Sequence, residues 1–150
     1  MNILKTITSI WNNFSDEERR RDLSHWRGCG RWQDDARWLK IGQNTLKDVE
    51  KVWRFVSRRK AELKDLAVLE WGPGGGSNAI ALKGIAKYYY GVDISKENLK
   101  EAGRQCAKEV EGEYFKPVLL SGYPGSIVNV VPQEIDLFIS TAVFQHFPSR

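Results

Sequence analysis

Apolar positions in the N-terminal part of the chain recur at helical spacing. Between residues 1 and 14 this pattern predicts an amphipathic helix that packs on the domain. Ser15 and Glu18 have the spacing of a capping box, which predicts the start of a second helix. A further apolar stripe predicts a helix from about Asn44 to Val56. The intervening segment His25–Gly42 is rich in tryptophan and is expected to be broken by its glycines.

From residue 65 onward, short apolar runs alternate with helical patterns. Strands are expected at Leu66–Leu69, Tyr88–Val92, Tyr114–Leu120 and Ile135–Ser140, and helices at Ser77–Leu82, Ser95–Glu109 and Ala142–Phe147. Alternating strands and helices predict an α/β fold with a parallel sheet and right-handed crossovers. Pro117 favours an edge position for the third strand. We therefore divide the chain into an N-terminal helical lid or extension, 1–64, and an α/β domain, 65–150.

Composition narrows the class of protein. No apolar run approaches the roughly 20 residues of a membrane-spanning helix, and the N-terminus lacks the continuous apolar core of a signal peptide. Cys29 and Cys106 are far apart and belong to no Cys/His cluster, so neither a metal site nor a disulfide framework is expected. These features predict a reduced, cytoplasmic protein without a membrane partner.

The formal net charge of +4 is concentrated in the N-terminal part. Residues 1–66 contain 15 Lys and Arg against 10 Asp and Glu. Such a surplus could attract nucleic acid, but Arg19–Arg21 follow three acidic residues, and Arg31 and Arg37 flank Asp34 and Asp35. Interleaved charges favour local ion pairs over a continuous basic stripe. We therefore expect a small-molecule partner and consider nucleic acid the less favoured one.

The candidate chemistry lies where the first two predicted strands end. Glu70 precedes a turn that contains Gly72, Pro73, Gly74 and Gly76, and Asp93 ends the next strand. Glycines in such a turn let a ligand approach the backbone closely. One acid could hold an ammonium group, and the second could accept hydrogen bonds from both hydroxyl groups of a ribose. S-adenosylmethionine carries these groups and has no pyrophosphate.

Three motifs resemble those of the class I S-adenosylmethionine-dependent methyltransferases. Glu70–Gly76 matches the acid-x-Gly-x-Gly-x-Gly loop of that family, Gly91–Ser95 resembles its second acidic motif, and Asp136–Phe147 is similar to its fourth-strand motif. The resemblance covers about residues 64–148. It implies a Rossmann-like sheet with helices on both faces, in which the four strands present lie in the order 3-2-1-4.

The family sheet has seven strands, so the resemblance also implies that this chain is a fragment truncated at its C-terminus. The strand Ile135–Ile139 would be central in the complete sheet. At the edge of a four-stranded sheet it would expose apolar residues, which invites self-association.

The resemblance further implies roles for individual residues. The loop Glu70–Gly76 would hold the methionine part of the cofactor, Asp93 the ribose, and Ile94 would lie against the adenine. Ser140 and Thr141 would line the cavity near the methyl group. Many members carry an acid after the third strand, near the adenine amino group, where this chain has Ser121.

The acceptor side is less constrained. His146 follows the fourth-strand motif and is the natural candidate for a general base, with a structural role as the alternative. His25 would reach the site if its segment folds over it. Two interpretations remain open for the surrounding segment: its tryptophans anchor it to the core, or they form the wall of an acceptor pocket. The residues that would bind the acceptor are His25, Arg31, Trp32, Arg37 and Trp38.

Three other functions are compatible with parts of the sequence. Gly74, Gly76 and Ala79 fit a G-x-G-x-x-A dinucleotide-binding pattern, although Glu70 and the fourth-strand motif argue against it. A nucleic-acid methyltransferase would make use of the basic N-terminal part. A catalytically inactive module would bind S-adenosylmethionine without transferring its methyl group.

Overall fold

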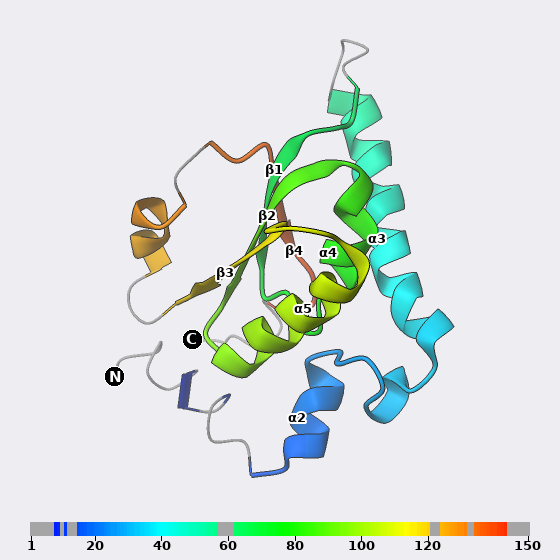
Figure 1. The fold of residues 1–150 in the computed structure, drawn as a ribbon, viewed down its shortest axis with the longest axis vertical. Coiled ribbons are helices and arrows are strands. Elements are labelled where there is room, and N and C mark those ends of the chain that lie inside the picture. The colour runs from blue at the N-terminus through cyan, green and yellow to red at the C-terminus, as the bar shows by residue number, and fades with distance from the viewer. Residues whose placement is uncertain are drawn as a thin grey trace.

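In the part of the chain that the structure describes, a four-stranded parallel sheet forms the centre of the protein (Figure 1). The computed structural model describes residues 8–9, 11, 15–56, 62–120, 124–131 and 134–143. Strand order is β3-β2-β1-β4, and all three pairings are parallel, which confirms the predicted α/β sheet and its order. The strands are β1 (Leu66–Trp71), β2 (Ala86–Asp93), β3 (Phe115–Leu119) and β4 (Leu137–Ser140).

The two edge strands of this sheet contain a proline and an exposed phenylalanine, respectively. At one edge, β3 contains Pro117 opposite Gly91, and an edge strand tolerates a residue without a backbone N–H. At the other edge of the described sheet lies β4, where the side chain of Phe138 is 56 % exposed. A large apolar side chain therefore lies exposed on an edge strand of this sheet.

Helices cover the two faces of the sheet differently. The helices α3, α4 and α5 pack on one face, and the short helix η3 packs on the other (Figure 1). Among the described residues, no helix combines the length and the apolar character needed to cross a bilayer. The α-helices are α2 (Glu17–Leu23), α3 (Asp35–Val56), α4 (Ser77–Ala81) and α5 (Lys96–Glu109); the 3-10 helices are η1 (Gly30–Trp32), η2 (Leu82–Gly84) and η3 (Pro124–Asn129).

The helix α3 begins about nine residues earlier than the apolar stripe predicts. Asp34 caps it, because its Oδ1 accepts hydrogen bonds from the backbone N–H groups of Ala36 at 2.8 Å and Arg37 at 3.2 Å. Gly42 was expected to interrupt this segment but lies inside the helix. A Cβ atom there would lie 2.2 Å from the carbonyl oxygen of Ser77. Gly42 thus allows α3 to approach α4 closely.

The prediction that Ser15 and Glu18 form a capping box is wrong, because α2 begins one residue later than such a box requires. Asp16, and not Ser15, is the N-cap of α2, and its carboxylate accepts a hydrogen bond from the backbone N–H of Arg19 at 2.9 Å. A charged carboxylate interacts more favourably with the positive end of the helix dipole than a hydroxyl group does. Within the helix predicted for residues 1–14, Thr8, Ser9 and Trp11 are described and helical.

The chain turns sharply after β4. Ala142 has a φ of 58°, in the left-handed region, so the helix predicted from Ala142 to Phe147 does not begin at its expected first residue. Val143 is not helical either, and residues 144–147 lie outside the described part of the chain.

Candidate functional site

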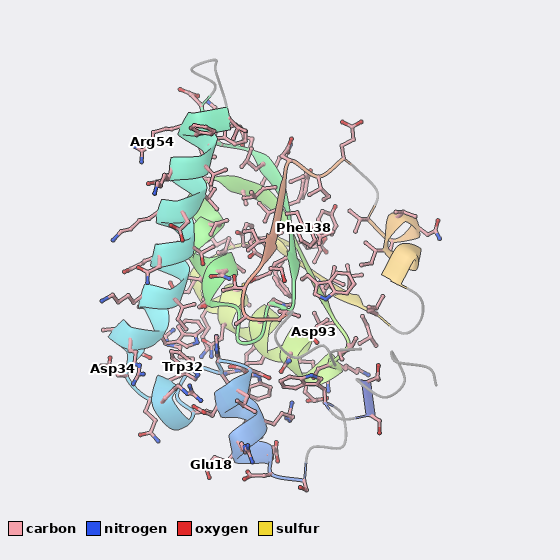
Figure 2. All side chains as sticks on the ribbon, turned by 180° about the vertical axis from the view of Figure 1, so that it is seen from behind. Glu18, Trp32, Asp34, Arg54, Asp93 and Phe138 are labelled. Atoms are coloured by element: carbon pink, nitrogen blue, oxygen red, sulfur yellow. The ribbon has the colours of Figure 1, made fainter. Side chains whose placement is uncertain are left out.

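A cavity of about 460 Å³ lies at the carboxyl ends of β1, β2 and β4. Because parallel strands end at the same edge of a sheet, the residues that follow them meet there. Figure 2 shows Asp93 at the end of the sheet nearest α2, and Leu23 of α2 lines the cavity together with Asp93. The cavity therefore lies between the sheet and the N-terminal segment.

Glu70 lies at the base of this cavity with its carboxylate almost fully buried. Its Oε1 accepts a hydrogen bond from Asn78 Nδ2 at 2.5 Å, and its Oε2 accepts one from the Tyr89 hydroxyl at 2.7 Å. Burial raises the pKa of Glu70 to about 7, although both hydrogen bonds act in the opposite direction; the nearby charge of Asp93 raises it further. A cationic group entering the cavity would favour the ionised form of Glu70.

Asp93 also lines the cavity, at the end of β2. Its Oδ1 accepts a hydrogen bond from the backbone N–H of Ser95 at 2.8 Å, and its Oδ2 accepts one from Asn98 Nδ2 at 3.2 Å. Burial raises the pKa of Asp93, while these hydrogen bonds act to lower it. Each carboxylate oxygen has more than one acceptor position. Asp93 could therefore accept further hydrogen bonds from a ligand.

The glycine-rich turn joins β1 to α4. Gly72, Gly74 and Gly76 have φ angles of 76°, 51° and 87°, which L-amino acids with side chains rarely adopt. The turn is closed by a hydrogen bond from the Gly76 N–H to the carbonyl of Pro73, at 2.9 Å. Gly72, Pro73 and Gly74 line the cavity. Gly76, which the resemblance also assigns to the cofactor, is not one of the lining residues. The turn thus presents the main chain of Gly72, Pro73 and Gly74 to the cavity.

The same glycines also serve contacts within the protein. A Cβ atom at Gly74 would lie 2.4 Å from the carbonyl oxygen of Ser24, and one at Gly75 would lie 2.2 Å from that of His25. The main chain of the N-terminal segment therefore crosses directly over the glycine-rich turn. Bare backbone at these two positions is needed for that crossing.

His25 is placed on the cavity wall by this crossing. Its backbone has a φ of 56°, and its carbonyl accepts a hydrogen bond from Trp38 Nε1 at 2.6 Å. Ser24 lines the cavity beside it. The position of His25 and Ser24 on the cavity wall agrees with the expectation that the tryptophan-rich segment folds over the site.

The other predicted acceptor-binding residues do not line the cavity. Trp38 is fully buried and Trp32 nearly so, and both belong to the core that joins the N-terminal segment to the sheet. Arg31 pairs with Asp22 at 2.8 Å, and Arg37 lies over the Trp32 ring. Of the two interpretations, the contacts of Trp32 and Trp38 favour anchoring.

The remaining predicted cofactor residues have mixed placements. Ile94 and Thr141 line the cavity. Ser140 is not one of its lining residues, and its hydroxyl donates a hydrogen bond to the carbonyl of Trp71 at 3.4 Å. Ser121 and His146 lie outside the described residues.

Sequence reasoning missed several polar residues of the site. Asn78, Tyr89 and Asn98 hold the two carboxylates, yet none belongs to the quoted motifs. The register offered one signal: Gly91 pairs with Glu70, so Tyr89 lies two residues away on the same face of the neighbouring strand. Among the buried polar atoms of the described residues, Asn78 Oδ1 and Ser24 Oγ have no hydrogen-bond partner. Both residues line the cavity.

Comparison with known proteins gives one family and two similar structures. A family described as the methyltransferase domain matches residues 69–150. Magnesium protoporphyrin IX methyltransferase (ChlM) from Synechocystis PCC 6803, solved with bound SAM, is 20 % identical over 99 % of this chain and 65 % of its own, with a TM-score of 0.60.

The second structure is the YcgJ protein from Bacillus subtilis, which is 24 % identical over 60 % of this chain and 36 % of its own, with a TM-score of 0.44. The chain thus spans less than two thirds of the length of either protein. Sequence comparison with curated proteins gives no significant match.

Proposed function

The chain belongs to the class I S-adenosylmethionine-dependent methyltransferases, and from this premise we propose that it transfers the methyl group of S-adenosylmethionine to a small-molecule acceptor. The observation that carries the proposal is the cavity between Glu70 and Asp93, at the ends of two adjacent parallel strands. S-adenosylmethionine carries two positively charged groups, an ammonium and a sulfonium, which a carboxylate attracts. It also carries a ribose, whose hydroxyl groups can donate hydrogen bonds to a carboxylate.

The polar atoms of the cavity fit this cofactor. Asn78 Oδ1 and Ser24 Oγ are buried acceptors without a partner in the protein, and a ligand ammonium group could donate to them. The ionised form of Glu70 would be favoured beside such a group, which would offset the cost of its burial. Asp93 would accept hydrogen bonds from the ribose hydroxyl groups.

Methyl transfer requires the protein to align the methyl donor with the acceptor more than to form covalent bonds with either. S-adenosylmethionine supplies a methyl group that is already activated by its sulfonium. Glu70 would hold the methionine part of the cofactor and Asp93 its ribose, while apolar side chains such as Leu23 and Ile41 line the cavity between them. Among the described residues, His25 lines the cavity, and we propose it for the acceptor side. His146 remains the sequence-based candidate for a general base.

Ion pairs formed by basic residues of the N-terminal part support a small-molecule acceptor. Arg31 pairs with Asp22 at 2.8 Å, and Arg27 pairs with Asp35 at 2.7 Å and also lies near Glu109. Cations engaged in ion pairs are poorly placed to track a phosphate backbone. The cavity, in contrast, suits a ligand held by a few polar groups among apolar walls.

Calorimetry tests the cofactor. The chain is titrated with S-adenosylmethionine, with its demethylated product S-adenosylhomocysteine, and with NAD. We expect binding of the first two and none of NAD. Binding of NAD alone would contradict the proposal and favour the dinucleotide interpretation.

Turnover tests the reaction and the acceptor. Release of S-adenosylhomocysteine is followed after addition of fractionated small metabolites or of nucleic acid. We expect release with a small-metabolite fraction. Cofactor binding without release in any fraction would favour an inactive binding module. Submicromolar, strongly salt-dependent binding of RNA or DNA would favour a nucleic-acid methyltransferase.

A further inference from the structure

We propose that Trp26 is a positioning residue for the ribose-binding carboxylate of Asp93, and that it acts through Asn98. This inference rests on the proposed function, because it concerns how the same cavity recognises the ribose of its cofactor. It assigns the N-terminal segment a part in cofactor recognition, whereas the sequence suggested a part in acceptor choice.

Two hydrogen bonds link the three side chains. Trp26 Nε1 donates to Asn98 Oδ1 at 3.0 Å, and Asn98 Nδ2 donates to Asp93 Oδ2 at 3.2 Å. Asn98 is buried in the first turn of α5, where its backbone N–H donates to the Ser95 hydroxyl at 3.3 Å. Asn98 and Asp93 line the cavity, and Trp26 does not. Trp26 therefore reaches the site through Asn98.

The chemistry of these groups fixes the orientation of the Asn98 amide. An indole N–H can only donate a hydrogen bond, so it requires the oxygen of the amide. A carboxylate can only accept, so Asp93 requires the nitrogen. With Trp26 present, one orientation of Asn98 satisfies both neighbours. Without the indole N–H, the amide could turn its oxygen toward Asp93, which would place two acceptors together and disturb the carboxylate.

Trp26 is itself held in place by its surroundings. The guanidinium groups of Arg20 and Arg21 each lie 5.2 Å from the centre of its ring. Its backbone N–H donates to the carbonyl of Arg21 at 2.9 Å. These contacts involve the ring and the main chain, so a phenylalanine at position 26 would keep much of them and lose the N–H.

Trp32 provides a matched control. Its Nε1 also donates a hydrogen bond, at 2.7 Å, but to the main-chain carbonyl of Asp22 and not to a side chain of the cavity. Trp26→Phe and Trp32→Phe therefore each remove one indole N–H and retain an aromatic ring. Only the first change affects a link to Asp93.

The experiment compares two ligands by calorimetry on the full chain. One is S-adenosylhomocysteine, and the other is an analogue whose ribose lacks both hydroxyl groups. For Trp26→Phe we expect the Kd of S-adenosylhomocysteine to rise about three- to tenfold. The Kd of the analogue should stay within about twofold, because it makes no hydrogen bond to Asp93. Trp32→Phe should not change the ratio of the two constants.

A second variant keeps the test independent of how well Trp26→Phe folds. Asn98→Ala breaks the same link without changing the tryptophan, and it should lower the preference for the hydroxylated ligand in the same way. Trp26→Phe added to Asn98→Ala should then lower that preference no further.

Equal weakening of both ligands by Trp26→Phe, or an unchanged ratio, would overturn the inference and leave the proposed function intact. If the unmodified chain binds neither ligand, the proposed function fails and the inference fails with it. The two failures are therefore distinguishable.

Discussion

The ionisation of the buried Glu70 is coupled to folding. Burial raises its pKa from 4.5 to about 7, so between these values the folded state holds a proton that the unfolded state has released. The contribution of Glu70 to stability is therefore most favourable below pH 4.5 and falls as the pH rises toward 7. The shift corresponds to about 3 kcal/mol.

We expect Glu70→Gln to remove this dependence. Urea unfolding at pH 5 and pH 8 measures the free energy of unfolding of both proteins. The stability of the unmodified chain relative to Glu70→Gln should fall by about 2–3 kcal/mol over that range, because part of the full effect is already lost below pH 5. A difference that stays constant with pH would contradict the prediction.

Glu113 is the control, because it is an exposed carboxylate whose pKa is lowered by its hydrogen bond with Lys116. The free energy of unfolding of the unmodified chain, compared with that of Glu113→Gln, should increase as the pH rises through the acidic range. This trend is opposite to the one expected for Glu70.

Asp93 is expected to dominate recognition of the ribose. Asp93→Ala removes a charged acceptor from the cavity, and losing hydrogen bonds to a charged group costs about 1.5–3 kcal/mol. The Kd of S-adenosylhomocysteine should rise accordingly, by about 10- to 150-fold. Calorimetry on a variant shown by circular dichroism to be folded measures this change. Unchanged affinity would mean that another group holds the ribose.

At the scale of elements, two helical glycines should respond in opposite ways to substitution by alanine. In α3, a Cβ at Gly42 would lie 2.2 Å from the Ser77 carbonyl oxygen. In α5, a Cβ at Gly103 would lie 3.7 Å from Phe115, which is ordinary contact. Alanine gains about 0.5–1 kcal/mol of helix propensity at either position, but overpacking costs about 1–3 kcal/mol.

Gly42→Ala should therefore destabilise the protein, and Gly103→Ala should stabilise it by about 0.5–1 kcal/mol. Thermal and urea unfolding check both signs. Stabilisation by Gly42→Ala would show that α3 can move away from α4 at little cost.

The elements differ in how far the sequence predicts them. The strands follow from their apolar runs, and their parallel order follows from the alternation with helices. The start of α3 cannot be predicted from its apolar pattern. The close contact between Gly42 and Ser77 outweighs the usual destabilising effect of a glycine inside a helix. The cap of α2 was missed by one residue, because adjacent Ser15 and Asp16 are both acceptable N-caps.

The part of the site that can be predicted from the sequence consists of residues close to the ends of strands. Glu70, the glycine-rich turn and Asp93 are adjacent to strand ends, so their meeting at one edge follows from the topology. Contacts between distant segments could not be derived in this way. Trp26 and Asn98 are 72 positions apart, and no periodic pattern relates them.

At the scale of the whole molecule, we expect the β4 edge of the described sheet to govern association. Phe138 is 56 % exposed on this strand, and unpaired edge strands promote pairing between chains. Phe138→Lys should raise the concentration at which the chain self-associates by about tenfold, because an edge lysine disfavours such pairing. Sedimentation velocity at several concentrations measures this effect.

Phe55 provides the control for that experiment. It is 88 % exposed on α3 and lies outside the sheet. Phe55→Lys should leave the association of the chain unchanged. Equal effects of both substitutions would assign the association to general surface hydrophobicity and not to the β4 edge.

The crossing of residues 24 and 25 over Gly74 and Gly75 has a consequence for chimeric enzymes. A foreign N-terminal segment joined to this sheet would have to present its own backbone at the same two points, where no side chain fits between the segments. Grafting that segment alone would create a mismatch at the crossing. The N-terminal segment and the turn beneath it therefore form one unit of exchange, and a successful recombination would have to inherit both from the same parent.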